Sequence, residues 1–271
     1  MKKLILILLI ASIMMSTVVL PVWAEMESLK QQEVDELETA IIDESKELII
    51  QDQFRINITE KDLSVREGLD KEWKNILLLG TDTGSASLNH GRTDTMIILS
   101  VNIKTGQMRL SSLVRDMQVN IPYRDNLYKI NVANAFGGPL LAIKAVNETF
   151  GLNITDYCSV NFSGFVKIID SLGGVELSLD IAEAFIAGAA LTTEPQVLNG
   201  TQALEYVRIR KLDNNFGRNN RQRILLSSIF EKIVSDSNMQ QITTALSEVL
   251  KYMSTNLTLN EVLQLTLPVL G

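Results

Sequence analysis

Apolar residues gather at the N-terminus and again from Trp73 onwards, and the stretch between these regions is mostly polar. After two lysines the run from Leu4 to Leu20 carries no charge, and the segment PVWA at 21–24 then puts small residues at the positions that a signal peptidase reads. This pattern predicts an export signal over residues 1–24. The run is short for a membrane-spanning helix, which favours cleavage after Ala24 over retention as an N-terminal membrane anchor.

The polar stretch at residues 25–72 is rich in Glu, Gln and Lys, and its few apolar residues recur at loosely helical spacing. Such a pattern predicts an acidic, partly helical stalk rather than a packed core. The composition changes at Trp73, so the folded domain is expected to cover residues 73–271.

Short apolar runs after Trp73 predict the first strands of a sheet. Residues 75–80 carry no charge and end in glycine, which is typical of a strand buried on both faces. Residues 96–101 and 108–113 are expected to follow as two strands joined by a hairpin turn at residues 104–106. The three strands together predict a central sheet.

Helical spacing of apolar residues recurs after these strands, with Pro, Asn or Gly near the ends, and predicts helices at residues 139–150, 202–208 and 218–237. Residues 160–171 are expected to pass from strand to helix, followed by a strand at residues 175–179. The last helices are expected to end at residues 256–260, before a short tail. The fold class predicted is α/β: a central mixed sheet flanked by helices in a single domain.

Composition and charge exclude some classes of function. The chain has 271 residues, of which 46% are hydrophobic, enough for a sizeable core. Residues 25–72 carry fifteen acidic and six basic side chains, whereas residues 73–271 carry seventeen of each. A neutral domain lacks the basic surface of a nucleic-acid-binding protein, so nucleic acid is not an expected partner. Cys158 is the only cysteine, which excludes a disulfide or a thiolate metal cage within one chain.

Two carboxylates are expected at one edge of the predicted sheet. Asp82 follows the first strand, and Asp94 lies just before the next. Two neighbouring carboxylates repel each other unless a cation lies between them, and a hard divalent ion binds carboxylate and phosphate oxygens. Spacing alone leaves two interpretations equal, a metal site or two aspartates that cap turns.

Arginines surround this edge in the sequence. Arg92 precedes Asp94, and the pair Arg115 and Asp116 closes another predicted strand. Arginine suits phosphate because its planar guanidinium donates two parallel hydrogen bonds and stays charged. A surface ion pair is nevertheless the usual role of a single arginine.

A second group of arginines favours the phosphate interpretation. Five of the chain's eleven arginines fall within sixteen positions, at Arg208, Arg210, Arg218, Arg221 and Arg223. Arg218 and Arg221, with Gln222, share one face at the start of a predicted helix, where the helix dipole disfavours cations by roughly a few tenths of a kcal/mol. A bound anion reverses that penalty, and helix N-termini bind phosphate through their amide groups. The cluster therefore predicts a pyrophosphate clamp.

Short motifs follow one another in a fixed order along the chain: NILLLGTD at 75–82, RTDTM at 92–96, SSLVRD at 111–116, KINVA at 129–133, FGG at 136–138, FSGF at 162–165, DSLGGV at 170–175, LNGTQAL at 198–204, VRIR at 207–210, FGR at 216–218 and RQR at 221–223. Each motif alone is a weak signal. In this order they resemble the LytR-CpsA-Psr family of cell-envelope phosphotransferases, over nearly all of residues 73–271.

The resemblance implies an α/β domain with a long apolar pocket for a polyprenyl tail. It implies transfer of a phosphate-linked glycopolymer, such as teichoic acid or capsule, from undecaprenyl pyrophosphate to a peptidoglycan sugar hydroxyl. The implied cofactor is Mg²⁺, or Mn²⁺ in its place, held by Asp82 and Asp94. The implied catalytic residues are Arg115, Asp94 and Asp116, and either Asp94 or Asp116 would take the proton of the acceptor hydroxyl. The implied pyrophosphate ligands are Arg92, Arg115, Arg208, Arg210, Arg218, Arg221 and Gln222.

Two other functions stay open on the sequence alone. One is a hydrolase that splits the lipid pyrophosphate with water, and the other is a non-catalytic binder of polyprenyl lipid or an envelope regulator. The expected partners are the lipid-linked glycopolymer, the peptidoglycan acceptor and the membrane surface. The expected location is extracytoplasmic, on the outer face of the cell membrane or in the envelope.

Overall fold

The computed structural model describes residues 55–82, 91–210, 212, 215–235 and 239–270. The predicted export signal and most of the predicted stalk lie outside these residues. Residues 56–271 form one compact unit. Within it Leu63 is 2% exposed and belongs to the same core cluster as Leu77, so this unit begins before the predicted boundary at Trp73. In the part of the chain that is described, every helix is too short or too polar to cross a membrane.

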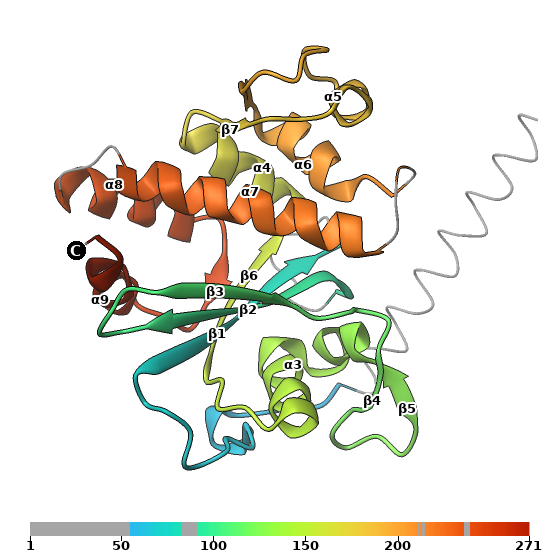
Figure 1. Cartoon of the computed structure of the whole chain (residues 1–271). Coiled ribbons are helices and arrows are strands. Elements are labelled where there is room, and N and C mark those ends of the chain that lie inside the picture. Colours follow the sequence, from blue (N-terminus) through green and yellow to red (C-terminus); the bar gives the residue numbers. More distant parts are fainter. Residues whose placement is uncertain (1–54, 83–90, 211, 213–214, 236–238, 271) are drawn as a thin grey trace, which may run out of the picture. The chain divides into compact units, whose positions relative to one another are not determined.

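A five-stranded mixed sheet runs through the centre of the compact unit, in the order β3-β2-β1-β6-β9 (Figure 1). Its strands are β1 (Trp73–Thr81), β2 (Thr93–Asn102), β3 (Met108–Ser112), β6 (Asp156–Asn161) and β9 (Ser254–Thr255). Strand β1 runs parallel to β6 and antiparallel to β2, and the outer strands β3 and β9 run antiparallel to their neighbours. The predicted central mixed sheet is confirmed.

Helices and two small hairpins complete the fold. The hairpins pair β4 (Gln118–Asn120) with β5 (Leu127–Lys129) and β7 (Val175–Leu177) with β8 (Gln196–Leu198). The helices are η2 (Glu60–Asp62), η3 (Ile130–Val132), α3 (Ala133–Phe150), α4 (Phe162–Ser171), α5 (Ile181–Ala187), α6 (Gly200–Arg208), α7 (Asn215–Ser235), α8 (Met239–Leu250) and α9 (Leu259–Leu270). Helices therefore flank the sheet as the α/β prediction requires.

Several predicted boundaries are corrected. Helix α3 begins before Pro139, and a break at Gly138, whose φ of 70° favours glycine, separates a first turn from the helix that Pro139 starts. The predicted short tail is instead α9, and the residues before it form β9 at the sheet edge. Helix α7 begins three residues before Arg218, which places Arg218 in its first turn.

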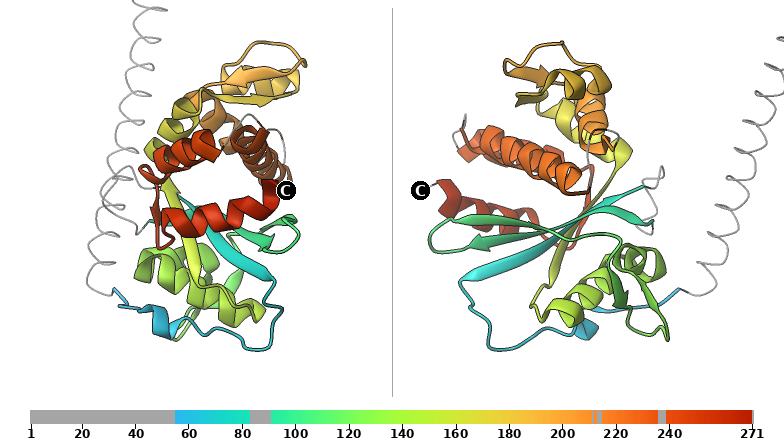
Figure 2. Two further views of the ribbon diagram at one scale, coloured as in Figure 1. Left: turned by 90° about the vertical axis from the view of Figure 1, so that its left-hand side faces the viewer. Right: turned by 45° about the vertical axis from the view of Figure 1, so that its right-hand side comes forward.

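The two faces of the sheet are covered by different helices. Successive strand residues point to opposite faces. Leu77 and Leu79 of β1 pack in one cluster with Leu141 of α3, whereas Ile76 packs in another cluster with Phe230 of α7. Two views show α3 on one side of the sheet and α7, α8 and α9 on the other (Figure 2).

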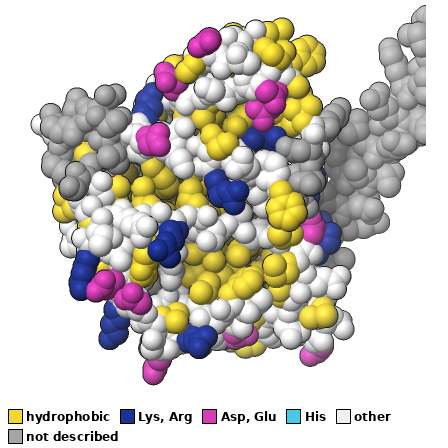
Figure 3. All heavy atoms as spheres, viewed as in Figure 1, with side chains coloured by type: hydrophobic (Ala, Val, Ile, Leu, Met, Phe, Trp, Pro, Cys, Tyr) yellow, Lys and Arg dark blue, Asp and Glu magenta, His cyan; other side chains and the backbone are white. Residues whose placement is uncertain are grey.

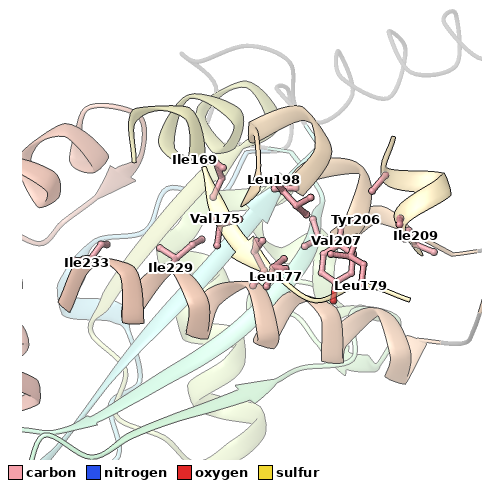
Figure 4. Close-up of a cluster of buried hydrophobic side chains, with 14 of the residues drawn as sticks. Ile169, Val175, Leu177, Leu179, Leu198, Tyr206, Val207, Ile209, Ile229 and Ile233 are labelled. Atoms are coloured by element: carbon pink, nitrogen blue, oxygen red, sulfur yellow. The ribbon is translucent and has the colours of Figure 1, made fainter. Parts of the chain in front are cut away.

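A third apolar cluster lies beyond α7 and joins α4, α5, α6 and the β7–β8 hairpin to it. In Figure 4, Val175 and Leu177 of β7 lie beside Ile229 and Ile233 of α7. Asn199 caps the start of α6, because its side chain accepts a hydrogen bond from the amide of Gln202 at 2.9 Å. This layer fixes the end of α6 and the start of α7, which carry the second group of arginines.

Candidate active site

Asp82 and Asp94 lie at the same end of the β1–β2 pair. Thr81 pairs with Thr93 across an irregularity in the register, and the amide of Asp82 donates to the carbonyl oxygen of Arg92 at 3.3 Å. The prediction that the two aspartates gather at one sheet edge is confirmed. Asp94 lies inside β2 rather than just before it, since β2 begins at Thr93.

Both carboxylate oxygens of Asp94 accept hydrogen bonds from arginines. Arg115 Nη1 donates to Oδ1, and Arg210 Nη2 donates to Oδ2 at 3.1 Å. Arg115 follows β3 and Arg210 follows α6, so residues far apart in the sequence meet at this carboxylate. The fold thus joins the two groups of arginines that the sequence separates.

Arg218 is the most deeply placed charge beside this carboxylate. Its residue is 5% exposed, and its Nε is buried with no hydrogen-bond partner among the described residues. Burial lowers the pKa of Arg218, and the neighbouring cations Arg115 and Arg210 lower it further, while Asp94 and Asp116 oppose the shift. A buried donor and three adjacent cations leave this corner short of negative charge, which an anionic ligand would supply.

Asp116 forms ion pairs with Lys129 and Arg115. Lys129 Nζ lies 2.8 Å from its Oδ1, and Arg115 Nε lies 3.4 Å from its Oδ2. The hydrogen bond from Lys129 lowers the pKa of Asp116, and Arg115 adds to this shift. A carboxylate with a lowered pKa is ionised at neutral pH and accepts a proton weakly.

Arg208 and Arg92 are both exposed. Arg208 ends α6, and its guanidinium carbon lies 4.8 Å from the centre of the Phe162 ring, which is a cation–π contact. Arg92 is exposed on the connection into β2. Phe162 and Asn161 were not predicted as site residues, and Asn161 caps α4 by accepting from the amide of Gly164 at 2.8 Å. The motif at 162–165 is the one signal that could have pointed to them.

Arg221 lies in the next turn of α7 and contacts residues outside the Asp94 site. Its side chain is 4% exposed, with Nη2 donating to the carbonyl oxygen of Ile209 at 2.8 Å and Nη1 lying 3.3 Å from Oε1 of Glu183. Arg218 and Gln222 line the cavity described next, whereas Arg221 is not among its lining residues. Its contact with a pyrophosphate stays a prediction.

A cavity of about 180 Å³ opens beside Asp94, between the sheet and α4, α6 and α7. We call it the outer cavity. Its polar lining includes Asp94, Asn161, Arg208, Arg210, Arg218 and Gln222. Apart from Thr95, the rest of its wall is mostly apolar, and among its charged groups Arg210 contacts Asp94.

A second cavity of about 230 Å³ continues from the outer cavity between the sheet and α7, α8 and α9, and we call it the inner cavity. Both cavities are lined by Leu78, Cys158, Val160, Phe165, Leu226 and Met253. The inner cavity is lined by apolar residues with Cys158 and Thr266, and burial raises the pKa of the Cys158 thiol. On the face shown in Figure 3, hydrophobic side chains reach the surface among scattered Lys and Arg side chains.

The carboxylates at the sheet edge fit one hard metal ion only in part. Within the described residues, no group of three or more His, Cys, Asp or Glu side chains could hold a metal ion. Mg²⁺ commonly binds one or two carboxylates and takes its remaining ligands from water and substrate phosphate. Asp82 and Asp94 match that donor set once a phosphate is present.

The fold and this site define a class of protein. The chain belongs to the LytR_cpsA_psr family, whose sequence model matches residues 28–271. This confirms the resemblance carried by the ordered motifs.

Two relatives are similar in sequence to about two thirds of the chain. A polyisoprenyl-teichoic acid–peptidoglycan teichoic acid transferase TagU from Oceanobacillus iheyensis is 39% identical over 195 residues, which are 69% of this chain and 58% of the relative. A TagU from Enterococcus faecalis is 38% identical over 188 residues, 67% of this chain and 62% of the relative. The chain therefore matches less than two thirds of the length of these relatives.

Solved structures share the fold. TagV from Bacillus subtilis superposes with a TM-score of 0.63 at 26% identity, covering 75% of this chain and 81% of TagV. The LytR-CPS2A-psr family protein YwtF (TagT) with bound octaprenyl pyrophosphate lipid superposes with a TM-score of 0.58 at 25% identity, covering 77% of this chain and 78% of TagT. The central sheet with flanking helices is thus the fold of this family.

Proposed function

We propose that the protein transfers a phosphate-linked glycopolymer of the teichoic acid or capsule type from undecaprenyl pyrophosphate to a peptidoglycan sugar hydroxyl. The observation that carries the proposal is the junction of two unlike cavities, one bordered by arginines and the other apolar. A polyprenyl pyrophosphate has the same division, with an anionic head and an apolar tail. The names of the two TagU relatives and the octaprenyl pyrophosphate bound to TagT support the same substrate class.

The pyrophosphate is assigned to the polar side of the outer cavity. Arg208, Arg210, Arg218 and Gln222 line that side, and Arg115 reaches it through Asp94. Arg92 is close in sequence and exposed, so it joins the proposed set at the rim. Arginines stabilise phosphoryl transfer because they neutralise charge that develops on the phosphate oxygens and the leaving group.

The reaction forms one P–O bond and breaks another. The acceptor sugar hydroxyl attacks the phosphorus that carries the polymer, the bond to the bridging oxygen breaks, and polyprenyl phosphate leaves. The hydroxyl proton passes to a carboxylate. Of the two candidates, Asp94 lines the outer cavity, whereas Asp116 does not line it.

The proposed metal is Mg²⁺ or Mn²⁺, held by Asp82 and Asp94, and it would supply positive charge to the phosphates. In the ligand-free chain both oxygens of Asp94 are engaged by Arg115 and Arg210. Asp94 and Asp82 would hold the metal through their carboxylate oxygens, and Arg115 and Arg210 at Asp94 would be placed to donate to phosphate oxygens. Asp94 thus keeps Arg115 and Arg210 at the proposed phosphate site before the substrate binds.

The proposed location is the outer face of the cell membrane or the envelope. The basis is the charge-free run after Lys2 and Lys3, which matches an export signal or anchor. A lipid-linked polymer and peptidoglycan are both met on that side, so location and substrate agree.

A transfer assay tests the proposal. A lipid-linked teichoic acid precursor is incubated with Mg²⁺, with and without a peptidoglycan oligosaccharide, and the products are separated by mass. The expected result is polymer joined to the sugar, with polyprenyl phosphate released only when acceptor is present. Equal polymer release into water without acceptor would identify a hydrolase, and lipid binding without turnover would identify a binder.

Asp94→Asn sharpens this assay. The variant should fold normally and lose transfer by about a hundredfold or more, because a neutral amide neither balances a metal ion nor takes a proton. Asp125→Asn is the matched control, since Asp125 is exposed and outside both cavities. Unchanged transfer in Asp94→Asn at an equal melting temperature would contradict the role of Asp94.

A further inference from the structure

Glu183 lies outside both cavities and yet contacts the arginine network. It is the third residue of α5, and its side chain is 15% exposed. Oε1 lies 3.3 Å from Nη1 of Arg221, while Oε2 accepts a hydrogen bond from the amide of Asp180 at 3.2 Å. One carboxylate thus joins the start of α5 to α7.

Arg221 also contacts the segment that carries Arg208 and Arg210. Its Nη2 donates at 2.8 Å to the carbonyl oxygen of Ile209. Ile209 is 3% exposed and stands between Arg208 and Arg210 in the chain. The backbone that carries both arginines is therefore tied to α7 at a buried point.

The surroundings of the pair make the contact sensitive to the loss of either partner. Tyr206 is 2% exposed beside it, and burial raises the pKa of its phenol to about 12, with the Glu183 carboxylate adding to the shift. Removal of the Glu183 carboxylate takes away one of the groups that hold the buried guanidinium of Arg221, so that the guanidinium shifts. Movement of Arg221 releases the carbonyl of Ile209.

We infer that Glu183 is a positioning residue for the transfer reaction, which acts through Arg221 and the Ile209 carbonyl to hold Arg208 and Arg210 at the outer cavity. This inference rests on the proposed function, because it presumes that these two arginines bind a pyrophosphate. It gives Arg221 an indirect role in place of the direct phosphate contact that the sequence predicts. Glu183 belongs to none of the motifs that carry the family resemblance.

The test separates positioning from simple stability by using both halves of the α5 cap. Asp180 and Glu183 cap α5 reciprocally, with Oδ1 of Asp180 accepting from the amide of Glu183 at 2.8 Å. Asp180→Ala and Glu183→Ala therefore both weaken the start of α5, but only Glu183→Ala removes the contact with Arg221. The ligands are geranylgeranyl pyrophosphate with Mg²⁺ and, as a tail without a head, geranylgeraniol.

Glu183→Ala should weaken pyrophosphate binding by about tenfold, the usual scale for losing a group that orients a ligand-binding residue, and leave alcohol binding unchanged. Asp180→Ala should lower the melting temperature by a similar amount and leave both affinities unchanged. Glu183→Gln, whose amide oxygen still accepts from Arg221, should restore most of the pyrophosphate affinity. In an Arg210→Ala background, Glu183→Ala should cause a smaller further loss than in the wild type.

Three outcomes would overturn the inference. Wild-type pyrophosphate affinity in Glu183→Ala removes any positioning role, and an equal loss in Asp180→Ala assigns the effect to the stability of α5. A full tenfold loss in the Arg210→Ala background shows that Glu183 does not act through the segment of Arg208 and Arg210. Failure of the wild type to bind the pyrophosphate more tightly than the alcohol would instead overturn the proposed function, and the positioning role with it.

Discussion

The two faces of the central sheet are built from the same strands and are packed in opposite ways. On the α3 face, Leu141 and Val146 are fully buried and pack in one cluster with residues such as Leu77. On the α7 face, Leu78 and Leu226 border cavities of about 180 and 230 Å³. The difference separates two tasks: one face stabilises the fold, and the other keeps an apolar space open.

Helix α7 repeats this division along its own length. Its first turns carry Arg218 and Gln222 towards the outer cavity, and its later turns carry Leu226, Ile229 and Phe230 to the cavity walls. A helix that packed solely for stability would not place a buried guanidinium beside two others. The open face therefore combines an apolar space with a site where arginines outnumber carboxylates, and both features suit one amphiphilic ligand.

The largest expected effect distinguishes the two faces by stability. Leu141→Ala on the closed face should lower the free energy of unfolding by about 2–5 kcal/mol, because it opens a cavity among fully packed neighbours. Leu226→Ala on the open face should cost less than about 2 kcal/mol, because part of its surface already faces empty space. Urea unfolding of both variants measures the difference, and equal losses would break the comparison.

Arg218→Gln tests the polar end of the open face. Burial and two neighbouring cations disfavour the charge of Arg218 in the ligand-free protein, so removing it should leave the melting temperature equal or slightly higher. Affinity for a prenyl pyrophosphate should fall by about 1.5–3 kcal/mol, the range for hydrogen bonds to charged groups. Thermal unfolding with and without geranylgeranyl pyrophosphate measures both quantities. An equal ligand-induced shift in variant and wild type would contradict the assignment.

The smallest expected effect is a pH dependence at Asp116. Its pKa in the folded protein is lowered from the usual 3.8, chiefly by the hydrogen bond from Lys129. The stability gained from this shift is present above the unfolded pKa and is lost as the pH falls through the lower folded pKa. Wild type should therefore exceed Asp116→Asn in urea stability at pH 6, and the gap should shrink below about pH 4. A stability difference between the two proteins that did not change with pH would rule out the ionisation of Asp116 as its cause.

Much of the sheet could be predicted because its signals are local. Residues 75–80 and 96–101 are uninterrupted apolar runs, and the tight turn at 104–106 joins the second run to β3. The edge that gathers Asp82 and Asp94 follows from the antiparallel pairing of β1 and β2. Strand β9 escaped prediction because two residues carry no pattern, and they become a strand only by pairing with β6.

The site was predicted as a set of residues but not as a geometry. The arginine-rich stretch indicated phosphate, yet its spacing could not reveal that Arg218 points into the cavity while Arg221 contacts Glu183, which lies 38 positions away. The cavities also could not be predicted from the pattern of apolar residues. Strand residues alternate in the same way whether their neighbours fill the space, as at Leu77, or leave it open, as at Leu78.

Whether the open face holds a prenyl tail below a pyrophosphate is best tested by paired affinities. Val160 lines both cavities, so Val160→Phe fills the proposed tail space without touching a charge. Calorimetric titrations with geranylgeranyl pyrophosphate and with geranylgeraniol would compare it with Arg218→Gln and wild type. Val160→Phe should weaken both ligands, whereas Arg218→Gln should weaken only the pyrophosphate. Wild-type affinity for both ligands in a folded Val160→Phe protein would contradict the account.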